Sequence, residues 1–167
     1  RSRFGATFKL DYYEHNDIKA ILKRSAKMLG LEITDVALNL IAQASRFTPR
    51  VANRLLRRVR DVAQVGQKKL VDEAVAKETL EMLEIDHLGL DPHDRRILDV
   101  IIEKFSGGPV GIGTLAAALN EDKGSIEDVH EPYLMSIGLL MRTPTGRKAT
   151  EKAYQHLHKS GSQNSLL

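Results

Sequence analysis

Six arginines lie close together in the first half of the chain, and their spacing bears on anion binding. They are Arg46, Arg50, Arg54, Arg57, Arg58 and Arg60. A guanidinium group is a planar fork of N–H donors that fits the oxygens of a phosphate. Arg50 and Arg54 are four residues apart and share one helix face near the expected N-terminus, where the helix dipole favours anions. The alternative is a solvated helix face that forms ion pairs with the acidic segments.

A second basic cluster surrounds a turn at residues 144–146 near the end of the chain. Its members are Arg142, Arg147, Lys148 and Lys152. A glycine-containing turn that carries basic residues can reach a phosphate or a minor groove. Charges on a short hairpin also keep its edge from pairing with other strands, so a purely structural role stays open.

Other chemistry has little support in the sequence. The glycine-rich segment 107–111 lacks the Lys and Ser/Thr of a phosphate-binding loop and is expected to be a turn. We expect no metal site, because there is no cysteine and no histidine pair at a ligand spacing. No nucleophile lies at a recognisable spacing from a base. The sequence by itself therefore favours binding over catalysis.

Helical periodicity places the arginine cluster in a four-helix bundle. The expected helices cover about residues 17–29, 35–44, 49–64 and 73–83. Their expected N-caps are Asn16 or Asp17, Thr34 or Asp35, Thr48 and Asp72. Thr48 followed by Pro49 is the clearest helix start, because proline at the first position loses no hydrogen bond.

The second cluster falls in a different pattern, after an expected domain boundary near residues 85–92. A helix begins at Asp91-Pro92, a short helix covers about residues 114–119, and Ser125 with Asp128 is expected to form the capping box of a third helix kinked at Pro132. Residues 139–143 and 147–149 form a hairpin, and a last helix covers about residues 150–158. This order predicts a winged-helix domain, so the fold class is mainly α with one small β-hairpin.

Composition excludes several classes of protein. The chain has 167 residues, 42% apolar and 28% charged, with a net charge of +3. No apolar run is long enough to cross a membrane, and we expect no signal peptide at the start of the sequence. Because the first residue is Arg1 and not Met, we expect a fragment of a longer protein.

Several strings of residues resemble the RuvB family of Holliday-junction branch-migration motors, which are hexameric AAA+ ATPases. The matching strings are RSRFG at 1–5, LDYY at 10–13, TPRVANRLLRRVRD at 48–61, GGPVG at 107–111, EPYL at 131–134 and RTP at 142–144. The resemblance runs in order from residue 1 to about residue 158. It implies the domains 1–10 (a remnant of the ATPase domain), 11–84 (a helical AAA+ lid) and 85–158 (a winged helix). The polar tail, residues 159–167, is expected to be disordered.

The resemblance also implies roles for individual residues. Arg3 corresponds to an arginine finger that acts on the neighbouring subunit's nucleotide, Tyr13 to an aromatic near the adenine and Arg50 to the sensor-2 arginine. Arg142, Arg147 and Lys148 are the expected DNA contacts. There are two departures from the family pattern: Phe47 stands where glycine is usual, and Thr145 stands at the wing tip where arginine is usual.

For the whole protein the resemblance implies ATP and Mg²⁺ as cofactors and a homo-hexamer in the bacterial cytoplasm. The implied partners are duplex or junction DNA and, through the ATPase domain, RuvA; no membrane is involved. The chain contains no Walker A or Walker B motif, so we expect it to hold no cofactor tightly and to hydrolyse no ATP alone. Two other functions stay open: a winged-helix transcription regulator with a helical dimerisation domain, and a non-enzymatic interaction module.

Overall fold

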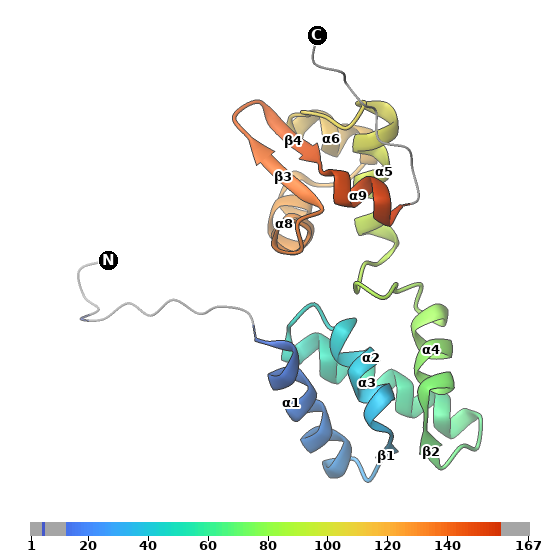
Figure 1. Ribbon diagram of the computed structural model, residues 1–167. Coiled ribbons are helices and arrows are strands. Elements are labelled where there is room, and N and C mark those ends of the chain that lie inside the picture. The colour runs from blue at the N-terminus through green and yellow to red at the C-terminus, as the bar shows by residue number, and fades with distance from the viewer. Residues whose placement is uncertain (1–4, 6–12, 158–167) are drawn as a thin grey trace. The chain divides into compact units, whose positions relative to one another are not determined.

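The computed structural model of the chain describes Gly5 and residues 13–157. These residues form two compact units that divide between Gly89 and Leu90 (Figure 1). The predicted mainly α fold class is confirmed. No helix among the described residues is long and apolar enough to span a bilayer. The predicted arginine finger, Arg3, and the predicted tail 159–167 lie outside the described residues.

All four helices predicted for the first unit are present. They are α1 (His15–Met28), α2 (Asp35–Gln43), α3 (Pro49–Val65) and α4 (Glu73–Met82). Two short strands, β1 (Glu32–Ile33) and β2 (Leu70–Val71), pair in parallel and were not predicted, because two residues are too few to show a strand period.

One aliphatic core holds the four helices together. Each helix contributes a side chain that is at most 1% exposed: Leu22, Ile41, Leu55 and Val75. Burial of a side chain of this size stabilises the fold by about 1.5–3 kcal/mol. The first unit therefore has its own core, as an independently folding domain requires.

The helix starts agree with the sequence in two cases and differ in two. Asp72 accepts a hydrogen bond from the backbone N–H of Val75, as predicted. Thr34, one of the two caps expected for α2, accepts from the N–H of Ala37. The prediction for α1 was wrong, because Glu14 is its N-cap and Asp17 accepts from the Glu14 backbone N–H.

Thr48 precedes α3 as predicted, but its side chain does not accept from the first turn. Its hydroxyl instead donates to the carbonyl oxygen of Arg46 at 2.9 Å. The residues before it turn sharply: Arg46 and Phe47 have φ of 54° and 52°, in the left-handed region. Glycine adopts that backbone without strain, which fits the glycine that the resemblance implied for position 47.

The second unit has the helix–helix–helix–hairpin order predicted for it. Its elements are α5 (Pro92–Lys104), α6 (Ile112–Leu119), α7 (Lys123–Ser125), the π-helix η1 (Ile126–His130), α8 (Glu131–Ser136), β3 (Leu140–Thr143), β4 (Gly146–Ala149) and α9 (Glu151–His156). The start of α5 is a capping box, in which Asp91 and Asp94 each accept from the other's backbone N–H.

The helix expected around Pro132 is divided into three parts. The predicted cap, Ser125, was wrong: it has α-helical dihedral angles and donates its backbone N–H to the N-cap Asp122 at 3.1 Å. The π-helical turn η1 comes next, and α8 begins at its end with Pro132 in its first turn. Proline has no N–H and its ring clashes with the preceding turn, so a wider turn is the local solution where a kink was expected.

The wing is the hairpin formed by β3 and β4, residues 140–149 (Figure 1). Val110, from the glycine-rich segment, pairs with Arg147 on the open side of β4 through two backbone hydrogen bonds of 2.8 and 2.9 Å. A Cβ atom on Gly108 would lie 2.4 Å from the Arg147 carbonyl oxygen, and one on Gly146 would lie 2.4 Å from that of Val110. The glycine-rich segment therefore packs against β4.

Candidate functional site

Arg50 is exposed in the first turn of α3, one residue after Pro49. The first turn of α3 contains no acidic residue, and the Thr48 side chain does not accept a hydrogen bond from the backbone N–H groups of that turn. Among the described residues, Arg50 and Arg54 form no ion pair. Tyr13, the predicted adenine neighbour, is 50% exposed and precedes α1. An anion could therefore approach Arg50 at the N-terminal end of α3, where the helix dipole adds to its charge.

Other arginines of the first cluster are committed to contacts within the unit. The Arg46 Nε donates to the carbonyl oxygen of Gly89 at 2.9 Å. Arg60 lies 2.8 Å from Asp61, and Arg58 lies 3.8 Å from the other carboxylate oxygen of Asp61. The solvated, ion-paired interpretation of the cluster thus describes its C-terminal part, while Arg50 and Arg54 remain available.

A hollow of about 530 Å³, which was not predicted from the sequence, lies between the C-terminal part of α3 and α4. Val65 and Met82 contribute to its lining and are 86% and 68% exposed. It does not include Arg50 or Tyr13, so it is separate from the predicted nucleotide contacts.

Arg147 is buried at the base of the wing, although the sequence predicted it as a DNA contact. Its residue is only 8% exposed. Its Nε donates to Glu131 at 2.5 Å, and its Nη2 donates to Glu127 at 2.7 Å and to Glu131 at 3.3 Å. The geometry gives Arg147 a structural role, tying β4 to η1 and α8, and leaves it little surface to offer a phosphate.

Arg142 shares the same carboxylate but is much more accessible. Its Nη2 donates to Glu131, and its side chain remains 51% exposed. Burial by itself raises the pKa of Glu131, but the hydrogen bonds and charges of Arg147 and Arg142 outweigh burial and hold that pKa below its ordinary value. The hydrogen bond to Glu131 likewise raises the pKa of Arg147. Glu131 and Arg147 are therefore both charged near neutral pH.

Lys148 is exposed and projects from the opposite face of the hairpin. It pairs with Met141 across the strands, whereas Arg142 pairs with Arg147. Because successive side chains alternate between the faces of a strand, the three predicted DNA contacts do not lie on one face. Lys152 is outside the wing and donates to the Ile137 carbonyl oxygen at 2.7 Å.

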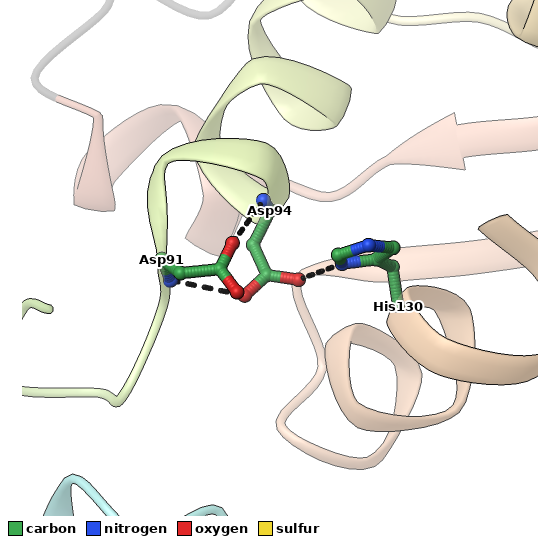
Figure 2. Close-up of side chains that lie close together, drawn as sticks. All are labelled: Asp91, Asp94 and His130. Atoms are coloured by element: carbon green, nitrogen blue, oxygen red, sulfur yellow. Dashed lines mark hydrogen bonds and ion pairs between the residues drawn. The ribbon is translucent and has the colours of Figure 1, made fainter. Parts of the chain in front are cut away.

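Asp91, Asp94 and His130 are close enough to resemble a metal site, and sequence spacing did not bring them together (Figure 2). Asp94 is fully buried, and one of its oxygens is hydrogen-bonded to His130 Nδ1 at 2.7 Å. The other oxygen of Asp94 and one of Asp91 serve the capping box of α5. These contacts give the group a structural role, because they fix η1 to the start of α5.

Two family models match consecutive parts of the chain. The model described as the RuvB AAA lid domain matches residues 13–86, and the model described as the RuvB C-terminal winged helix domain matches residues 87–158. Together they cover most of the chain and follow the two units of the fold.

Curated relatives with high identity carry the same name. The Holliday junction branch migration complex subunit RuvB of Dehalococcoides mccartyi is 55% identical over 157 residues, which are 94% of this chain and 45% of that protein. The RuvB subunit of Rubrobacter xylanophilus is 54% identical over 155 residues, covering 93% of this chain and 44% of that protein. The chain thus spans less than half the length of these relatives.

A solved structure agrees with both comparisons. The Thermotoga maritima RuvB Holliday junction branch migration motor superposes with a TM-score of 0.92 at 46% identity, over 95% of this chain and 53% of that one. The high identity and the shared fold extend over nearly the whole of this chain, so they establish its family. The chain belongs to the RuvB family and contains the lid and winged-helix domains of that family.

Proposed function

We propose that this chain is the lid and DNA-binding part of a RuvB-type motor that moves Holliday junctions in recombination and repair. The observation that carries the proposal is the continuous match of a lid domain and a winged-helix domain to RuvB proteins at about half identity. The exposed cations at the start of α3 and on the wing fit the two anions of such a motor, nucleotide and DNA.

In this proposal the lid contacts nucleotide through Arg50, with Tyr13 near the base and Arg3 acting on the neighbouring subunit. Arg50 is exposed at a helix N-terminus with no acidic neighbour in the first turn, which supports an anion-sensing role. ATP and Mg²⁺ belong to the whole motor, because the sequence here has no Walker A or Walker B motif. The arginine finger would stabilise charge that develops on the transferred phosphate.

The winged-helix domain contacts duplex DNA through the exposed wing cations Arg142 and Lys148. Arg147 stabilises the base of the wing. We do not propose it as a DNA contact, because its guanidinium forms ion pairs with Glu127 and Glu131. The whole motor is a homo-hexamer in the bacterial cytoplasm, and RuvA binds it through the ATPase domain.

A chimera tests the proposal. Residues 13–157 of this chain replace the corresponding domains of the Thermotoga maritima motor, and branch migration of a synthetic junction is measured with RuvA and ATP. The chimera is expected to be active, and Arg50→Ala is expected to lower its rate at least tenfold. Arg57→Ala, which removes another exposed arginine of α3, is the matched control and should keep the rate within about twofold. A folded hexameric chimera without branch migration would contradict the proposal.

A transcription regulator is the second candidate, because a winged helix is also common in sequence-specific DNA binding. Binding to a panel of unrelated duplexes separates the two. A motor should bind all of them within a few-fold, whereas a regulator should prefer one sequence by about a thousandfold or more. An interaction module should bind none, even at low salt.

A further inference from the structure

The base of the wing contains two arginines that would repel each other if nothing lay between them. Arg142 and Arg147 are directly opposite each other in the register of β3 and β4. Like charges in such a pair destabilise a hairpin. The carboxylate of Glu131, from α8, accepts hydrogen bonds from both guanidinium groups and is itself only 1% exposed. The buried negative charge of Glu131 therefore allows the two arginines to lie opposite each other.

The two arginines use that carboxylate unequally. Arg147 donates to Glu131 with two of its nitrogens and to Glu127 as well, and its side chain is 10% exposed. Arg142 donates with Nη2 alone, and its side chain is 51% exposed. Arg147 is thus fixed in the interior, whereas Arg142 is held through one nitrogen only.

A hydrogen bond through Nη2 alone leaves the other N–H donors of Arg142 available. A guanidinium has five N–H donors, and those not directed at Glu131 form no hydrogen bond to any other described residue. A long side chain normally loses rotamer freedom when it binds a ligand, and this loss opposes binding. Arg142 has already lost much of this freedom in the unbound protein.

We propose that Glu131 is a positioning residue for DNA binding: it holds the guanidinium of Arg142 so that its free edge faces a backbone phosphate. This inference rests on the proposed DNA-binding function and adds a residue to it. The low pKa of Glu131 supports it, because the carboxylate stays ionised and keeps both arginines at neutral pH.

The opposite role makes an opposite prediction. If Glu131 only neutralised Arg142 and competed with DNA for it, removal of its charge would strengthen DNA binding. If Glu131 positions Arg142, the same change weakens binding even though the protein becomes more positive. The sign of the effect therefore distinguishes the two roles.

The test measures the affinity of the whole chain for a fluorescent 30-base-pair duplex at fixed low salt by anisotropy. Glu131→Gln is expected to weaken binding about threefold to tenfold. Asp128→Asn is the matched control, because it removes one exposed negative charge from the same turn without touching Arg142. The control is expected to bind as tightly as the unchanged chain, or more tightly.

A second pair of variants keeps the test valid if Glu131→Gln disturbs the fold. Arg142→Lys retains the charge and leaves the buried Glu131–Arg147 pair intact, but a lysine cannot bond Glu131 and a phosphate through a rigid planar fork. It should lose nearly as much affinity as Arg142→Ala. In the Arg142→Ala background, Glu131→Gln should have no further effect on affinity.

Each outcome decides the matter. The inference is overturned if Glu131→Gln binds DNA as tightly as the unchanged chain or more tightly, if its effect persists in full without Arg142, or if Arg142→Lys keeps the original affinity. If the unchanged chain binds no duplex, the proposed DNA-binding function fails first and the inference fails with it. Weakened binding that depends on Arg142 supports both.

Discussion

Arg50 and Arg147 have the same side chain, and the sequence predicted an anion contact for both, yet the fold treats them differently. Arg50 is exposed at the start of α3, with no acidic residue in that turn. Arg147 is buried against Glu127 and Glu131, which are 20 and 16 residues away in the sequence. Whether an arginine can bind a ligand therefore depends on carboxylates that local spacing does not reveal.

The largest expected difference between the two arginines is in stability. Arg147→Met removes the buried ion pair with Glu131, which keeps only the half-exposed Arg142 as a partner among the described residues. The change should destabilise the second unit by about 3 kcal/mol. Arg50→Met should change the first unit by less than about 0.5 kcal/mol, because it removes an exposed side chain. Hydrogen exchange followed peptide by peptide in urea reports each unit separately. Equal, small effects from the two changes would remove the distinction.

Acid should lower the stability of the second unit more than that of the first. The loss should be smaller than the loss caused by Arg147→Met. The folded-state pKa of Glu131 lies below its ordinary value of 4.5, so its contribution is fully present above about pH 4.5 and is lost as the pH falls further. Stability of the second unit measured from pH 7 to pH 3 should decline more steeply in the unchanged chain than in Glu131→Gln. Parallel declines would show that this carboxylate contributes nothing in acid.

An arginine placed at the wing tip should act like Arg50 and unlike Arg147. Thr145 is exposed and hydrogen-bonds within the turn, to Thr143 at 3.2 Å, so it is not committed to any other element. Thr145→Arg should tighten duplex binding a few-fold and steepen its dependence on salt by about one ion. Thr145→Gln, which adds length without charge, should do neither. An unchanged affinity in Thr145→Arg would place the wing tip away from DNA.

Several helix starts that depend on near neighbours could be predicted from the sequence. The starts at Thr34, Asp72 and Asp91 follow from a capping side chain that meets a backbone N–H three residues later. The winged-helix order followed from periodicity and from the turn at residues 144–146. These elements need no information from distant parts of the chain.

The failures involve competing or distant contacts. Ser125 has the right residue type for a cap, but Asp122 takes that place three residues earlier. The π-helical turn before Pro132 leaves no periodic signal in so few residues. The pairing of Arg147 with Glu131, and of Asp94 with His130, joins residues from separate elements, so only the folded chain brings them together.

The most direct test of the account is the salt dependence of duplex binding by the unchanged chain and by Lys148→Ala. Lys148 is an exposed wing cation, and among the described residues it has no ion-pair partner. We predict that affinity falls steeply and linearly in a plot of log affinity against log salt, for any sequence, and that Lys148→Ala reduces the slope by about one. No binding at low salt, or an identical slope for the two proteins, would contradict the claim that the exposed cations of this winged helix hold the DNA backbone.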